Sequence, residues 1–305
     1  MVAPFLRFEN GKISLNNKDL MVSSANLSIS PNMQTERVYG DYLEGVSGSR
    51  VDFVNFAPTS NLRGQLDVTF YISADTLYSN KQTNTIDRLF EIKEGMSELP
   101  INTNRVGRYF FDNMYLKSFG FSFTPYQLIR AQASYDIYGS IQKEGGAFLP
   151  KTEANFAHGL KSFGEMRATG LIADQAIDGQ FEITSLKYNI LVERKPSNSI
   201  RASENTRINT QSSGVRPTRV TVGTIESEMN IECNDMIPHL NSYGDQQLGS
   251  SPQTLQQSEV SAHLYSMQQE KIATFSTRGK IQTQSTSISE GDYAKSNITI
   301  KQIIK

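Results

Sequence analysis

The chain has 305 residues, which is long enough for two domains with separate cores. Its 30 basic and 31 acidic side chains leave a net charge of −1, and charged residues make up only 20% of the chain. This balance argues against a protein that holds nucleic acid through an overall basic surface, so any such binding has to be local.

The first half predicts strands on either side of a long polar segment. An alternating run from Lys18 to Ser30 enters that segment, and a second run from Gln65 to Ile72 leaves it. Asn84 or Thr85 caps a short predicted helix that ends near Gly95. A hairpin should close this half, because two alternating runs lie on either side of a Thr-Pro-Tyr turn over residues 119–137.

The second half repeats this order. The run from Phe181 to Val192 enters a polar segment, and the run from Arg219 to Ile231 leaves it. The apolar positions of the later run change parity at Gly223, which predicts a β-bulge there. Ser251 with Pro252 resembles a helix start, and the spacing of Val260, Leu264 and Met267 favours a helix before the closing strands.

The doubled order indicates duplication. We predict an all-β protein with short flanking helices and two tandem β-sandwich or barrel domains, residues 1–150 and 151–305. The junction should lie within 145–179, where glycines and a proline interrupt the pattern.

The two polar segments are the most informative parts for function. Each is long for an ordinary connection, and loops of that length are typically functional or disordered. Pro31 to Gly64 contains several aromatic residues, and Arg194 to Arg219 has a basic excess that suits an acidic protein surface or phosphates; a flexible solvated loop is the plain alternative. The candidate contact residues are Arg37, Tyr39, Tyr42, Phe53, Arg194, Lys195, Arg201, Arg207, Arg216 and Arg219.

Patterns for catalysis or metal binding are weak. The three histidines lie far apart in sequence, and the single Cys233 in an alternating run predicts a buried apolar residue. Glu226 and Glu228 share one strand face, which favours a solvated acidic face over a glycosidase pair. We therefore expect no enzyme, cofactor or metal. Because no signal sequence or long apolar run is evident, we also expect a soluble protein made in the cytoplasm.

Two blocks carry a resemblance to a known family. In Leu116 to Gly139, a Ser-Phe-x-Phe strand turns at Pro125 into an Ala-Ser-Tyr-Asp-Ile-Tyr strand. In the second half, Gly-Val-Arg-Pro-Thr-Arg, residues 214–219, feeds the run Thr221 to Glu232. With this element order in both halves, the chain resembles the tail tube proteins of long-tailed bacteriophages, including members with two tube domains per subunit.

The resemblance implies a virion structural protein made in the host cytoplasm. In that family, the inner sheets of neighbouring domains join into a barrel, and long loops reach the adjacent ring. A two-domain subunit should form trimeric stacked rings with pseudo-sixfold symmetry. Its partners would be further copies of itself, the tape measure, terminator and baseplate proteins, and double-stranded DNA that passes through the lumen without sequence recognition; no membrane insertion is implied.

Other functions remain open from the sequence. A tail-end, baseplate or neck component would have a similar sequence texture. A receptor-binding or carbohydrate-binding β-module of the tail is a second class, although the chain has no Trp to offer as a stacking platform. A polysaccharide-processing enzyme is a third class, but this sequence lacks the paired-acid pattern that such an enzyme needs.

Overall fold

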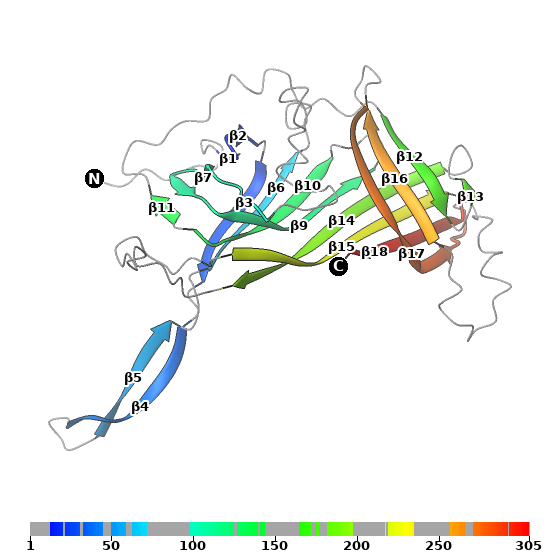
Figure 1. The fold of residues 1–305 in the computed structure, drawn as a ribbon. Helices are drawn as coiled ribbons and strands as arrows, with labels where there is room; N and C mark the ends of the chain where they lie inside the picture. Colours follow the sequence, from blue (N-terminus) through cyan, green and yellow to red (C-terminus); the bar gives the residue numbers. More distant parts are fainter. Residues whose placement is uncertain are drawn as a thin grey trace.

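The computed structural model describes residues 13–20, 22–30, 33–44, 50–58, 63–71, 98–124, 127, 129–139, 141–143, 165–172, 175–176, 182–197, 217, 219–234, 257–265, 271–291 and 293–304. Within these ranges the protein is all-β and contains no helix, which confirms the predicted fold class (Figure 1). The predicted helix near residues 84–95 lies outside them.

An eleven-stranded antiparallel sheet runs through both halves of the chain, in the order β13-β12-β16-β17-β18-β15-β14-β9-β10-β6-β3. Its first-half strands are β3 (Val22–Ser30), β6 (Arg63–Tyr71), β9 (Met114–Phe123) and β10 (Arg130–Ile137). Its second-half strands are β12 (Glu165–Ile172), β13 (Gln175–Ala176), β14 (Glu182–Ser197), β15 (Arg219–Asn234), β16 (Gln257–Tyr265), β17 (Lys271–Ser287) and β18 (Lys295–Ile304).

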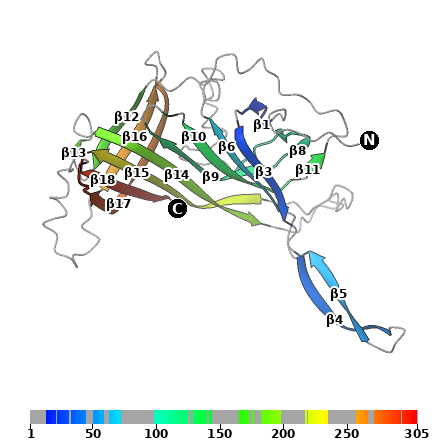
Figure 2. The same ribbon diagram turned by 180° about the vertical axis from the view of Figure 1, so that it is seen from behind.

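Two smaller sheets accompany the large one. The first has five short strands, β1 (Ile13–Leu15), β2 (Lys18–Asp19), β7 (Asn104–Val106), β8 (Tyr109–Phe111) and β11 (Ile141–Lys143), in the order β11-β8-β7-β1-β2. The second is a separate hairpin of β4 (Met33–Glu44) and β5 (Arg50–Pro58), which projects away from the other strands (Figure 2).

The strand order of the large sheet is repeated. In the first half, β3 pairs with β6, β6 with β10, and β10 with β9. In the second half, β14 pairs with β15, β15 with β18, and β18 with β17. If β12, β13 and β16 are set aside, these four strands have the same arrangement as the first-half set, with the first beside the second, the second beside the fourth and the fourth beside the third. The two sets meet where β9 pairs with β14. Because they share one sheet, a division into two domains at 145–179 stays a prediction.

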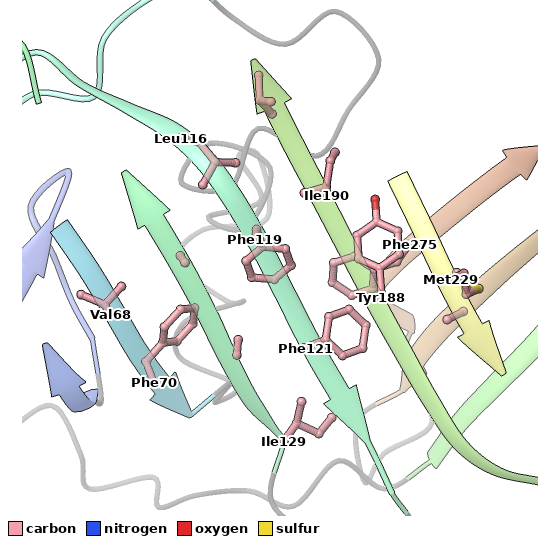
Figure 3. Close-up of a cluster of buried hydrophobic side chains, with 14 of the residues drawn as sticks. Val68, Phe70, Leu116, Phe119, Phe121, Ile129, Tyr188, Ile190, Met229 and Phe275 are labelled. Carbon is pink, nitrogen blue, oxygen red and sulfur yellow. The ribbon is translucent and has the colours of Figure 1, made fainter. Parts of the chain in front are cut away.

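One face of this sheet is apolar and forms the core. Alternate side chains of β6, β9, β10 and β14 point to that face, as period-two geometry requires. In the first half, Leu15 of β1 and Phe111 of β8 belong to the same buried cluster as Met114 of β9. The five-stranded sheet therefore covers the apolar face there. In the second half, Phe275 of β17 lies against Phe121 and Tyr188 (Figure 3).

Strand β17 reaches both layers because it bends. Its residues Lys271–Lys280 pair with β16, whereas Lys280–Ser287 pair with β18, and the register shifts between Ile281 and Thr283. The first part therefore places Phe275 over the core, and the second part continues the large sheet. This β-bulge lets one strand turn a corner of the sandwich.

Two sequence predictions are wrong. Val260 and Leu264 lie on strand β16 instead of a helix; Val260 and Ala262 are fully buried, and β12 and β17 pair with the strand on both sides. The segment Pro31–Gly64 is not an irregular loop, since β4 and β5 within it pair from Met33↔Pro58 to Glu44↔Arg50. In both cases cross-strand pairing supplies structure that local composition does not reveal.

Candidate functional surface

The second face of the large sheet is polar, and we call it the polar face. Cross-strand register arranges its side chains in rows that run across β6, β10, β9, β14, β15 and β18. The first row is Tyr71, Arg130, Ser122, Lys187, Asn230 and Thr299. The second is Thr69, Gln132, Gly120, Asn189, Glu228 and Lys301, and the third is Asp67, Ser134, Ser118, Leu191, Glu226 and Ile303.

The polar face is hollowed along β9, where the two halves meet. Ser118, Gly120 and Ser122 form the floor, and longer side chains of β10 and β14 stand on either side of it. The hollow has a volume of about 640 Å³ and is open to solvent. A β-carbon on Gly120 would lie 2.2 Å from Asn189 Oδ1, so the absence of a side chain there keeps the floor low. We call this hollow the trough.

Charges around the trough are balanced. Lys301 Nζ lies 2.8 Å from Glu226 Oε2, and this ion pair raises the pKa of the lysine. Arg130 and Lys187 stand at one end of the trough, Glu228 lines its middle, and Glu226 stands at the other end. The predicted acidic strand face is therefore part of a mixed surface rich in Ser, Thr, Asn and Gln.

The eight strands of the two repeated sets end in edges without charges. Strand β3 pairs only with β6 among the described strands, and Val22–Ser30 contains no charged residue and no proline. At the other end, Ile281–Ser287 of β17 pair with β18 on one side only among the described residues, and they too lack charges and proline. Ile29 near the end of β3 is 54% exposed. Soluble proteins usually protect open edges with charges, so such edges are typical of strands that another chain completes.

Both long insertions leave the sheet at the same end. The β4–β5 hairpin joins the sheet at Ser30 and Arg63, which are paired, and residues 198–218 join it at Ser197 and Arg219, also paired. Through β6, β10 and β9 these two positions lie along the same end of the sheet (Figure 1).

A cluster of arginines and tyrosines connects the bases of the insertions. Arg194 Nε donates to the Leu116 carbonyl at 2.9 Å, and its guanidinium lies 5.5 Å from the Tyr115 ring. Tyr115 packs edge-on against Tyr138, whose ring lies 5.9 Å from the Arg63 guanidinium. Arg63 in turn forms two hydrogen bonds to Asp136. Burial raises the pKa of Tyr138, so this phenol stays neutral inside the cluster.

The structure separates the predicted contact residues. Arg37, Tyr39 and Tyr42 lie on β4 and Phe53 on β5, so they belong to one hairpin. Arg194 and Lys195 are not loop residues, because they lie on β14; Arg194 is buried, with its guanidinium over the Tyr115 ring. Arg219 begins β15, where its Nε lies 3.0 Å from Glu98 Oε2. Arg201, Arg207 and Arg216 lie outside the described residues.

The predicted bulge at Gly223 is confirmed. Val192 pairs with Ile225 and Arg194 with Val222, so Gly223 and Thr224 together face the single residue Glu193. The Glu193 carboxylate accepts the Thr224 N–H at 3.1 Å and lies 3.2 Å from Lys195 Nζ. These contacts lower the pKa of Glu193. A β-carbon at Gly223 would lie 2.4 Å from this carboxylate, so a larger residue there would require the exposed Glu193 side chain to move.

Candidate chemistry elsewhere is limited. Cys233 is buried, as predicted, and burial raises its thiol pKa to about 11, which leaves it unreactive. His263 bonds through both ring nitrogens to Thr169 and Thr274 hydroxyls on neighbouring strands. In the described ranges, no three His, Cys, Asp or Glu side chains gather in a way that would hold a metal ion.

A scan against protein-family models and a search of curated protein sequences each found no match for this chain. The structure has no helix of sufficient length and hydrophobicity to span a membrane, within the residues that it describes.

Proposed function

We propose that this chain is a virion structural protein that assembles into the tail tube of a bacteriophage, with the polar face lining the channel. The observation that carries the proposal is the repeated set of four strands, fused into one eight-stranded wall. At its two edges, β3 and residues Ile281–Ser287 of β17 have no second partner among the described strands and carry no charge. Adding β3 of one copy to the free part of β17 in the next would repeat the β9–β14 junction between subunits. This pairing would satisfy both edges.

The dimensions of such an assembly suit a DNA channel. Three copies would supply about 24 strands, and with strands about 4.8 Å apart and tilted by about 40° the backbone radius is about 24 Å. Side chains on the inner face would leave a channel about 35 Å wide, which exceeds the roughly 20 Å of a B-form duplex. The eight strands of one copy would close, by the same geometry, to a radius of only about 8 Å and leave no channel.

The composition of the polar face fits transit of DNA. Its Ser, Thr, Asn and Gln side chains offer hydrogen bonds without a continuous basic groove, so a duplex would not be held in place. The apolar face is already covered within the chain, which leaves the polar face for the solvent-filled side.

The insertions at one end of the sheet provide the stacking contacts in this proposal. The β4–β5 hairpin and residues 198–218 would reach from one trimeric ring to the next, while the arginine–tyrosine cluster holds their bases. At the ends of the tube, terminator, baseplate and tape measure proteins are the proposed partners. A subunit that closes the tube as a tail-end, neck or baseplate component would use the same ring but would not stack.

Electron microscopy and mass measurement of concentrated protein test the proposal. We expect trimeric rings, and long tubes if the subunit repeats along the tail. Ile29→Lys should leave a folded monomer that forms no rings, because it places a charge in the proposed seam at a residue already exposed in the single chain.

The matched control is Leu191→Lys. Leu191 is similarly exposed, at 48%, but lies on β14 in the middle of the polar face, so this variant should still assemble. Wild-type protein that remains monomeric at every concentration, or an Ile29→Lys variant that assembles normally, would contradict the proposal.

A further inference from the structure

The first row of the polar face contains an unusual placement of positive charge. Arg130 of β10 and Lys187 of β14 both pair with Ser122 of β9, one from each side. Their backbones are therefore two strand spacings apart, about 10 Å. Between them lies only the small Ser122 side chain at the end of the trough, so the two long cationic side chains can approach one ligand from opposite sides.

Neither cation is neutralised by a carboxylate in the described structure. The Arg130 guanidinium lies 5.4 Å from the Tyr71 ring, a contact that orients it without consuming its charge. Among the described residues Lys187 has no ion-pair partner; Asn230 is its neighbour in the row on β15. By contrast, Lys301 in the next row is paired with Glu226.

We propose that Arg130, Ser122 and Lys187 form a contact site for the phosphate groups of double-stranded DNA. The two cations would bind phosphate oxygens, and the Ser122 hydroxyl would donate a hydrogen bond between them. This proposal deepens the proposed function by giving the polar face one defined point of contact with the duplex, and it rests on that function for the identity of the ligand.

The shape and charge of the trough favour a polymer over a small anion. A small phosphate needs several converging donors, whereas this site is open and its charges stand about 10 Å apart. Along the strands, the third row lies four residues away, about 13 Å, and carries Asp67 and Glu226. Glu226 is paired with Lys301, but Glu228 lies nearer, in the second row about 7 Å from the first. Glu228 and Asp67 repel phosphates, so binding is confined to the first row. A duplex would be contacted briefly and locally, which is compatible with passage.

Binding can be measured on the unassembled subunit with a fluorescent 20-base-pair duplex. We expect weak binding at 50 mM salt without dependence on base sequence. Two phosphate contacts predict a slope of about −1.8 in a plot of log affinity against log salt, which is about a tenfold loss between 50 and 200 mM. Lys187→Gln should halve the slope, and the double variant with Arg130→Gln should remove binding.

Lys143→Gln is the matched control, because Lys143 is an exposed lysine on β11 of the smaller sheet and its replacement changes the net charge equally. This variant should bind the duplex as the wild type does. Inorganic phosphate at constant ionic strength should displace the duplex no better than chloride; strong displacement would overturn the assignment to DNA in favour of a small-anion site.

The result is independent of ring formation. Absence of duplex binding at 50 mM salt, or binding that the double variant retains, would overturn this proposal even if rings form. Conversely, a subunit that binds the duplex through these residues but never assembles would keep the contact site and contradict the tube.

Discussion

Phe275 should tie the stability of the second half to that of the first. It is fully buried on β17, with ring centroids 4.6 Å from Phe121, 5.4 Å from Tyr188 and 6.2 Å from Phe119. Phe119 and Phe121 belong to β9, the strand of the first set that pairs with β14 of the second. Removing the Phe275 ring would leave a cavity against β9 and β14, where the two halves meet. Phe→Ala substitutions of this kind cost about 3–5 kcal/mol.

We expect Phe275→Ala to lower the free energy of unfolding by about 4 kcal/mol in one cooperative transition. For a chain of this size that corresponds to a fall in melting temperature of about 6 °C. Calorimetry and urea unfolding, followed by far-UV and near-UV circular dichroism, would measure both quantities. Ile303→Ala is the control: Ile303 is 58% exposed on the polar face, and its loss should change stability by about 0.5 kcal/mol or less.

Two separate transitions, of which Phe275→Ala shifts only one, would refute this reasoning. That result would show that the halves unfold as independent domains and that the β9–β14 junction transmits little stability. A loss below about 1 kcal/mol would show that the site collapses around the smaller side chain or that the cluster is not packed as described.

Three further predictions concern other parts of the chain. Gly279→Ala should destabilise the protein by about 2–3 kcal/mol in denaturant unfolding, because the new β-carbon would lie 1.9 Å from the Lys301 carbonyl oxygen where β17 bends. The control Ser276→Ala should cost about 1 kcal/mol or less, because it removes only an exposed hydrogen bond with the Ser261 hydroxyl. The thiol of Cys233 has its pKa raised from 9.0 to about 11, so its stabilising contribution is complete below pH 9 and is lost as pH rises through 11; Cys233→Ala should flatten this part of the stability profile. Replacing the arginines of the basic segment with Gln should weaken polymerisation, most at low salt where screening is least, and leave duplex affinity unchanged, as light scattering and anisotropy would show. The positions are Arg201, Arg207 and Arg216.

The sequence alone was sufficient for features set by near neighbours. Strict alternation predicted β6, β9 and β10, because successive side chains of a strand point to opposite faces whatever the rest of the fold. The same alternation predicted burial of Cys233, and its break at Gly223 predicted the bulge. It also indicated the repeated order of elements.

Some sequence patterns fit two kinds of local structure, and at these positions the sequence indicates the wrong one. Val260 and Leu264 are four residues apart, a spacing that fits a helix and also a strand whose alternate residues are buried. The polar composition of residues 31–64 suggested a loop, although β4 and β5 stabilise each other through backbone pairing that composition does not encode. Arg194 is among the contact residues predicted from the basic excess of residues 194–219, yet it lies on β14, where a carbonyl and a tyrosine ring satisfy it inside the protein.

Only the tertiary structure could reveal the candidate sites. Arg130 and Lys187 lie far apart in the chain, and they face each other across Ser122 because β9 pairs with β10 on one side and β14 on the other. Register between distant strands also determines the rows of the polar face and the open edges at β3 and β17. Local sequence decides which side of a strand is apolar, whereas the partner of each strand depends on the packing of the whole core. Strand pairing therefore decides which polar side chains come together.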